Sequence, residues 1–145
     1  MKILACTDGS EQSKRALEEA SKIAAGCGAD EVAIIYVYEY MQAFIYGSSV
    51  DREIKRLSEL EEQYKEEGKK IVSEALKIFE KKNIKARTIV EQGHPSEVII
   101  KVASEGGFDL IVIGSRGRGG LKKLLLGSVS SAVVHEANTD VLTVK

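Results

Sequence analysis

The sequence has 145 residues, of which 43% are hydrophobic and 30% charged, a balance typical of a globular domain rather than a disordered chain. The 21 basic residues nearly match the 22 acidic ones, so net charge gives no reason to expect nucleic acid or an anionic membrane as a partner. No apolar run approaches the roughly 20 residues that cross a bilayer, and the apolar start stops at Asp8, too soon for a signal peptide. We therefore expect one cytoplasmic domain over residues 1–145.

Short apolar runs alternate with helical patterns along the chain. The runs predict strands at Lys2–Thr7, Glu31–Tyr38, Ala86–Glu91, Asp109–Gly114 and Asp140–Lys145. Most are continuously apolar and rich in β-branched residues, as expected for strands covered on both faces. The alternation predicts an α/β fold, a single-domain open five-stranded parallel sheet with helices on both faces.

Helices are predicted between these strands from apolar residues at helical spacing and from capping residues. They are expected from Ser10 to Gly26 or Gly28, over Ile54–Phe79, from Pro95 onward, and from near Ser128 to before Asn138. Between them, Glu39–Asp51 is a long irregular stretch that contains Tyr40, Phe44 and Tyr46. It is interpreted either as a loop folded onto its own domain or as a lid or partner contact.

The two cysteines, Cys6 and Cys27, and the two histidines, His94 and His135, lack the spacing of a disulfide framework, a metal site or a cysteine–histidine nucleophile pair. Cys6 lies inside an apolar run, so we expect a small buried side chain there. We predict no catalytic residue and no metal site built from protein ligands.

A glycine-rich segment follows the fourth predicted strand, beginning at Gly114 and Gly117 and ending at Gly127-Ser128. Glycine at a strand end lets the main chain approach a ligand closely, and the helix opened by Gly127 offers N–H groups and a positive dipole end to an anion. No Asp or Glu occurs from Leu110 to His135. The basic residues of this region are Arg116, Arg118, Lys122 and Lys123. The pattern favours phosphate binding over a flexible surface loop with solvated charges.

Asp8 closes the first predicted strand as Gly114 closes the fourth. In an open parallel sheet, ligands bind beyond the carboxyl ends of the strands where the strand order reverses. If these two strands are neighbours, Asp8 faces the glycine loop and can accept hydrogen bonds from ribose hydroxyls; its alternative role is to cap the following helix. Neither a Walker loop nor the dinucleotide fingerprint occurs in the chain.

With its spacing Gly-x2-Gly-x9-Gly-Ser at Gly114, Gly117, Gly127 and Ser128, the chain resembles the universal stress protein family, specifically its ATP-binding branch. The opening Ile3–Ser10, the Gly93-His94-Pro95 turn and the strands at both sides of the glycine loop also fall where that family has them. The resemblance implies a Rossmann-like fold of the adenine nucleotide alpha hydrolase type, with the first and fourth strands adjacent. Cys6 departs from the proline or valine of many nucleotide-binding relatives.

The resemblance also implies a site. Thr7 and Asp8 would contact the nucleoside, and the Val37 main chain would lie near the adenine. The residues expected at ribose and phosphates are Gly114, Arg116, Gly117, Gly127, Ser128, Val129 and Ser130. The expected ligand is ATP, with ADP or AMP as alternatives and Mg²⁺ carried on the phosphates. A homodimer is expected through the last strand, whose apolar edge otherwise needs protection.

The function expected from the residues and the resemblance together is a nucleotide-binding regulatory or stress-response protein. The alternative is a slow ATP hydrolase or an autophosphorylating enzyme that uses the same site. A scaffold with an empty crevice is a third interpretation, and the intact glycine spacing argues against it. Phosphoryl transfer needs a metal clamp and a positioned base, and no acidic pair for magnesium is visible near the predicted crevice.

Overall fold

The structure, a computed structural model, describes residues 1–39, 50–117 and 126–145. The strands are β1 (Lys2–Cys6), β2 (Glu31–Tyr38), β3 (Arg87–Gln92), β4 (Leu110–Gly114) and β5 (Asp140–Val144). The helices are α1 (Glu11–Cys27), α2 (Val50–Glu80), α3 (Pro95–Glu105) and α4 (Ser128–Glu136). Among these helices of the described ranges, none is both long enough and apolar enough to cross a membrane.

The strands form one parallel five-stranded sheet in the order β3-β2-β1-β4-β5. The chain therefore builds outward from β1 to β3 on one side and then returns to place β4 on the other side of β1. The pairing of β1 with β4 matches Ile3 with Leu110 and Ala5 with Val112. The strand order reverses at this pair, which is the position where open α/β sheets bind ligands.

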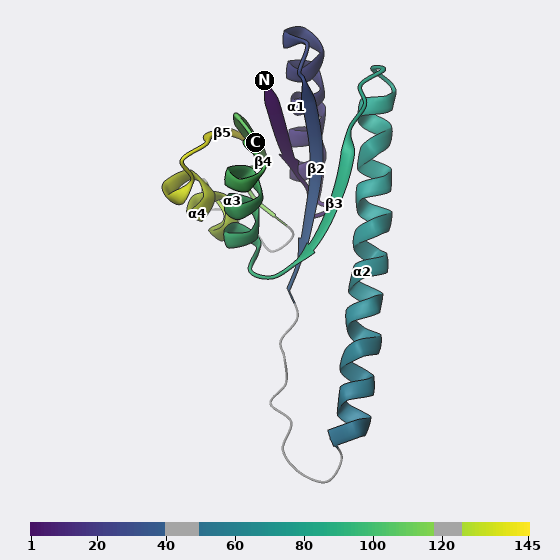
Figure 1. The fold of residues 1–145 in the computed structure, drawn as a ribbon. Coiled ribbons are helices and arrows are strands. Elements are labelled where there is room, and N and C mark those ends of the chain that lie inside the picture. The colour runs from purple at the N-terminus through teal and green to yellow at the C-terminus, as the bar shows by residue number, and fades with distance from the viewer. Residues whose placement is uncertain (40–49, 118–125) are drawn as a thin grey trace.

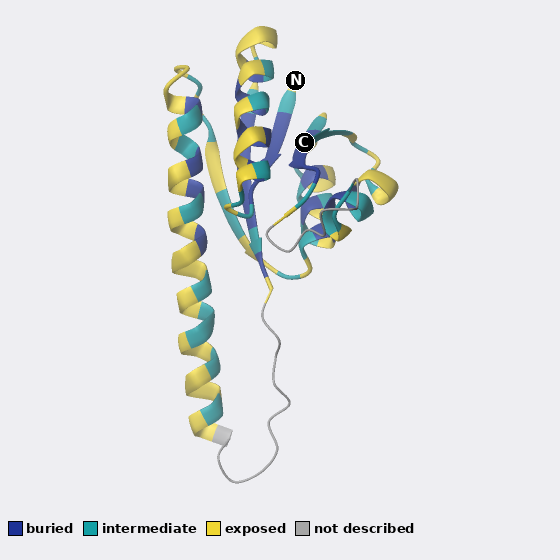
Figure 2. Cartoon of the chain, turned by 180° about the vertical axis from the view of Figure 1, so that it is seen from behind, coloured by how far each residue is buried: buried dark blue, intermediate teal, exposed yellow. Residues whose placement is uncertain are grey.

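Helices cover both faces of the sheet, α1 and α2 on one face and α3 and α4 on the other (Figure 1). The alternation of side chains along β1 divides the core, because Ile3 and Ala5 pack toward α1 and α2 whereas Leu4 and Cys6 pack toward α3 and α4. Burial on both faces explains why these strands are apolar at consecutive positions. In Figure 2 the buried residues accordingly lie along the sheet and the inner sides of the helices.

The predicted architecture is confirmed, with small shifts at the element ends. Ser10 caps α1 by accepting a hydrogen bond from Ser13 N–H, and Gly28 ends that helix in the left-handed conformation at φ 61°. Helix α3 begins at Pro95 as predicted. Helix α2 begins at Val50, so Val50 and Asp51, which were predicted to be irregular, belong to the helix. Tyr40, Phe44 and Tyr46 lie outside the described residues.

Helix α2 approaches the sheet so closely at Gly68 that a side chain has no room. An ideal Cβ there would lie 2.7 Å from Tyr36 Cδ1 and 2.8 Å from Val90 Cγ1. Gly68 is buried between α2 and the strands β2 and β3, although glycine costs a helix interior about 1 kcal/mol relative to alanine. The close packing of helix on sheet is the reason for glycine at this position.

We predict that Gly68→Ala destabilises the protein in spite of alanine's higher helix propensity. The added methyl must push Tyr36 or Val90 aside, and overpacking of this kind costs about 1–3 kcal/mol. Thermal or urea unfolding followed by circular dichroism measures the change. The matched control is Gly26→Ala in α1, where an added Cβ meets nothing within 4 Å, so its stability should stay equal or rise. A Gly68→Ala protein as stable as the control would contradict this packing.

Candidate functional site

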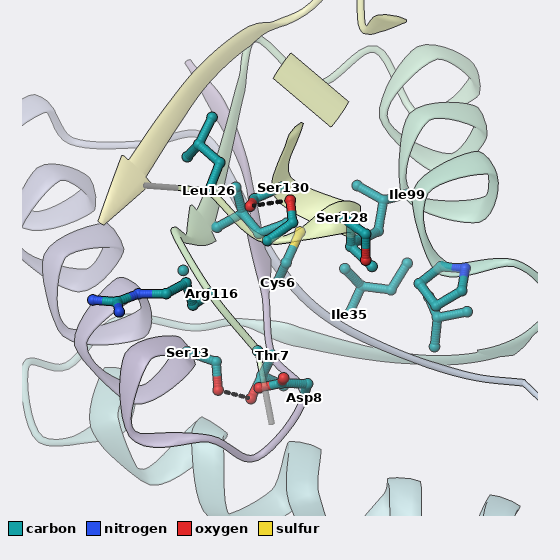
Figure 3. A pocket seen from close by; sticks show the side chains of 17 residues that line it. Cys6, Thr7, Asp8, Ser13, Ile35, Ile99, Arg116, Leu126, Ser128 and Ser130 are labelled. Atoms are coloured by element: carbon teal, nitrogen blue, oxygen red, sulfur yellow. Dashed lines mark hydrogen bonds between the residues drawn. The ribbon is translucent and has the colours of Figure 1, made fainter. Parts of the chain in front are cut away.

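A cavity of about 490 Å³ opens at the carboxyl ends of β1 and β4, within the size range of sites that bind small molecules. Its lining comes from the ends of β1, β2 and β4, the turns that follow β1 and β4, and the first turns of α3 and α4 (Figure 3). The lining residues are Cys6, Thr7, Asp8, Ser13, Ile35, Val37, Pro95, Ile99, Ile113, Gly114, Arg116, Gly117, Leu126, Gly127, Ser128, Val129 and Ser130.

The turn after β1 fixes the position of Asp8. Thr7 N–H donates to Ile35 C=O at 2.9 Å, which continues the β1–β2 pairing one residue beyond the strand. Asp8 Oδ1 then accepts a hydrogen bond from Ser10 N–H at 2.9 Å, and Gly9 takes φ 79°, a conformation that favours glycine. Ser10, rather than Asp8, caps the helix. The Asp8 side chain therefore stabilises the turn and lines the cavity at once.

The Thr7 hydroxyl is engaged in the same turn. Ser13 Oγ donates to Ser10 C=O at 2.8 Å, so in its 3.1 Å contact with Thr7 Oγ1 the threonine is the donor. Thr7 Oγ1 also accepts from Gly9 N–H at 3.2 Å. Thr7 is thus placed at the cavity as predicted, but its hydroxyl also links β1 to the start of α1.

The carbonyl group of Ser115, at the start of the glycine loop, holds the end of the loop and the start of α4. It accepts hydrogen bonds from Gly127 N–H at 2.7 Å and from Ser130 Oγ at 2.8 Å. Ser115 N–H in turn donates to Val144 C=O of β5 at 2.7 Å. The beginning of α4 is therefore fixed to the end of β4, and through it to the last strand. The Ser130 hydroxyl, which was expected at the phosphates, donates within the protein.

The first turn of α4 faces the cavity with main-chain N–H groups. Its first helical hydrogen bond runs from Ser131 N–H to Gly127 C=O at 2.9 Å, so the N–H groups of Ser128 and Val129 precede the helical ladder. No side chain caps this helix, and its first turn contains no acidic residue. The helix dipole and these N–H groups give the cavity a positive end suited to an anion.

One wall of the cavity is apolar. Its residues are Cys6, Ile35, Val37, Ile99 and Ile113, which all belong to the core on the α3 and α4 side of the sheet or pack against it. In Figure 3 Ile35 and Ile99 lie on the same side of the cavity as Ser128. Burial raises the pKa of the Cys6 thiol, so Cys6 acts as a small apolar side chain, as predicted, and not as a reactive thiolate.

Arg116 supplies the cationic side chain among the described lining residues. Its Nε atom is buried and has no hydrogen-bond partner among the atoms described, and in Figure 3 the guanidinium group points away from Ile35 and Ile99. The other basic residues of the predicted positive region, Arg118, Lys122 and Lys123, lie outside the described residues. Asp8 is the carboxylate among the described lining residues, and the described chain contains no group of three or more His, Cys, Asp or Glu side chains suited to a metal ion.

The glycines of the loop differ in what surrounds them. An ideal Cβ on Gly114 would lie 3.0–3.1 Å from main-chain atoms of Gln12 and Ser13, so this glycine lets α1 pack against β4. On Gly117 it would lie 2.6 Å from Asp8 Oδ2. On Gly127 it would make only ordinary contacts, at 3.5 Å or more, and φ of −77° suits any residue. Of these three glycines, Gly127 alone leaves room for a side chain among the residues that the structure describes.

The structure brings every sequence-predicted site residue to this cavity. They are Thr7, Asp8, Val37, Gly114, Arg116, Gly117, Gly127, Ser128, Val129 and Ser130. The sequence analysis missed the apolar wall, which includes Ile35, Ile99 and Ile113. Each of these residues lies in an apolar pattern that indicates only a buried side chain of a strand or helix. The turn ending at Pro95 was the available signal, since it directs the start of α3 toward the same end of the sheet.

Comparison with known proteins gives a consistent result over the whole chain. Residues 1–145 match the universal stress protein family. The chain is 36% identical to the universal stress protein YxiE of Bacillus subtilis, with 99% of this chain and 98% of YxiE covered. The solved structure of MJ0577 from Methanocaldococcus jannaschii superposes with a TM-score of 0.81 at 34% identity, covering 99% and 94% of the two chains. A universal stress protein crystallised in complex with cAMP superposes with a TM-score of 0.72 at 27% identity, covering 100% and 97%.

Proposed function

The chain belongs to the universal stress protein family, and we propose that it is a regulatory protein that binds an adenine nucleotide, ATP above all, in the cavity between β1 and β4. The observation that carries the proposal is the pairing, in one cavity, of an apolar wall with an uncapped helix N-terminus. A purine base fits the first and phosphates fit the second. The complex of a relative with cAMP supports the same ligand class.

Beyond the end of β1, main-chain groups of β2 are available to recognise adenine. The last hydrogen bond between the two strands runs from Thr7 N–H to Ile35 C=O, and the chain then turns at Gly9. Main-chain groups of a strand alternate between its two neighbours, so Val37 presents its N–H and C=O on the same side of β2 as Ile35. A donor and an acceptor at this spacing can pair with N1 and the N6 amino group of adenine.

The remaining groups are assigned to the sugar and the phosphates. Asp8 accepts hydrogen bonds from ribose hydroxyls, and the N–H groups of Ser128 and Val129 donate to the phosphates, with Arg116 adding positive charge. Ser130 and Thr7 hold the two turns in place through their hydroxyl groups. Magnesium arrives bound to the phosphates in this proposal, because the described residues present Asp8 and no metal-ligating cluster.

We predict that Gly127→Val abolishes nucleotide binding and leaves the fold intact. The main chain at Gly127 accepts any residue, but a Cβ there lies beside the main chain of Arg116 and Gly117, and the valine methyl groups fill the space proposed for the phosphates. Calorimetric titration with ATP, with and without Mg²⁺, measures the affinity, and circular dichroism checks the fold. Gly26→Val on the exposed part of α1 is the matched control and should bind as the unchanged protein does. An unchanged affinity of Gly127→Val would reject this site.

The proposal of binding rather than turnover is tested separately. Pure protein incubated with ATP and Mg²⁺ should leave the nucleotide largely intact over many minutes, since a single carboxylate that accepts from Ser10 N–H and faces ribose is poorly placed to position water at the γ-phosphate. Phosphate release and mass spectrometry of the protein follow hydrolysis and phosphorylation. Multiple rapid turnovers, or a phosphorylated Ser128 or Ser130, would favour the enzyme. Mass spectrometry of any nucleotide that co-purifies separates ATP from ADP and AMP.

We further propose a homodimer through β5 and a cytoplasmic location. The two sheet edges differ, because β3 carries Arg87, Glu91 and Gln92, whereas β5 reads Asp-Val-Leu-Thr-Val and its apolar residues are only partly buried. Charged edges resist pairing and apolar edges invite it. Both cysteines are free thiols, as is typical of a reducing compartment.

We predict that Thr143→Pro converts the dimer to a monomer. Val144 faces β4, since its C=O accepts from Ser115 N–H, so the N–H of Thr143 points to the open edge. Proline removes that donor without touching the pairing with β4. Light scattering after size-exclusion chromatography measures the mass. Thr143→Val keeps the N–H and should remain dimeric; a Thr143→Pro dimer would place the interface elsewhere.

A further inference from the structure

We infer that Gly117 is a positioning residue for Asp8, and that it sets the preference of the site for ligands with ribose hydroxyls. This inference rests on the proposed function. It assigns the second glycine of the loop to the sugar side of the ligand, whereas its place in a phosphate-loop pattern suggests the phosphate side. Asp8 belongs to the turn after β1 and Gly117 to the turn after β4, and the two residues meet at the cavity.

The reason for glycine at position 117 is space and not backbone conformation. The described glycines with positive φ are Gly9, Gly28, Gly93 and Gly107, so the main chain at Gly117 is open to other residues. An added Cβ, however, would lie 2.6 Å from Asp8 Oδ2 and 3.7 Å from Asp8 Cγ. Contacts under 3.0 Å between these atoms are essentially absent from proteins, so either the carboxylate or the loop must move.

The carboxylate has little freedom to move without changing its direction. Asp8 has a short side chain, and Oδ1 is already held by Ser10 N–H at 2.9 Å. Because the end of a side chain shifts more easily than main chain, we expect the carboxylate to give way, so that a methyl group at position 117 turns Oδ2 out of its present place or breaks the bond to Ser10. In both cases the acceptor that the proposed function gives to ribose is displaced. The start of α4 is held separately by the Ser115 carbonyl, so the phosphate end keeps its geometry.

The experiment compares ATP with 2′,3′-dideoxy-ATP, which has the same base and phosphates but lacks the hydroxyls. Affinities are measured by calorimetry for the unchanged protein and for Gly117→Ala, Asp8→Ala, Gly127→Ala and Gly26→Ala. The unchanged protein should prefer ATP about tenfold or more, since hydrogen bonds to a charged group are strong. Gly117→Ala and Asp8→Ala should bring this ratio close to one. Gly127→Ala should weaken both ligands and keep the ratio, and Gly26→Ala, where an added Cβ meets nothing within 4 Å, should change neither.

A double variant covers the case in which Gly117→Ala binds too weakly to measure. Removing the carboxylate removes the atoms that the new methyl would meet, so Gly117→Ala with Asp8→Ala should bind dideoxy-ATP as well as Asp8→Ala does alone. A full ATP preference in Gly117→Ala, or a further loss in the double variant, overturns the inference and leaves nucleotide binding in place. A ratio near one in the unchanged protein removes the ribose role of Asp8 and the inference with it. Absence of binding of either nucleotide to the unchanged protein overturns the proposed function itself.

Discussion

The parallel pairing of β1 with β4 is the constraint on which the site depends. Because the chain reverses its direction of growth across the sheet at this pair, β1 continues into α1 on one face and β4 leads to α4 on the other. The two following turns therefore separate and leave the cavity between them. The pairing itself is secured by fully buried residues, among them Leu4, Ile111 and Val112, so the site is built on a fully buried part of the sheet.

The two turns that form the site are also positioned by close contacts at Gly114 and Gly117, where a side chain would be crowded. Gly114 brings the first turn of α1, with Ser13, against the end of β4. Ser13 in turn holds Thr7 at the end of β1. Gly117 admits the Asp8 carboxylate. These contacts tie the turn after β1 to the turn after β4, so a change in one turn is transmitted to the other by direct contact.

The sequence predicts the fold well because its signals are local. Short apolar runs predicted every strand to within one residue of the observed ends. Ser10 and Pro95 predicted the starts of α1 and α3, and of the two glycines considered for the end of α1, Gly28 is the cap. The glycine spacing, the strand-end Asp8 and the family resemblance also predicted residues that line the cavity. The physical reasons for the glycines could not be predicted from the sequence, because a contact such as that between Gly117 and Asp8 joins residues far apart in the chain. The apolar wall could not be predicted for the same reason, since its residues come from separate strands and helices.

The arrangement of polar groups favours binding of an anionic ligand over chemistry on it. The Ser115 carbonyl fixes the start of α4 by accepting from Gly127 N–H and Ser130 Oγ, so the donors at the helix end are in place before any ligand arrives and little ordering opposes binding. Chemistry on that ligand would also need a base that activates a nucleophile or a water molecule. One oxygen of Asp8 accepts from Ser10 N–H, and burial keeps the Cys6 thiol protonated by raising its pKa. The same Ser115 donates to Val144 C=O of β5, so the start of α4, the end of β4 and the edge strand are joined by consecutive hydrogen bonds.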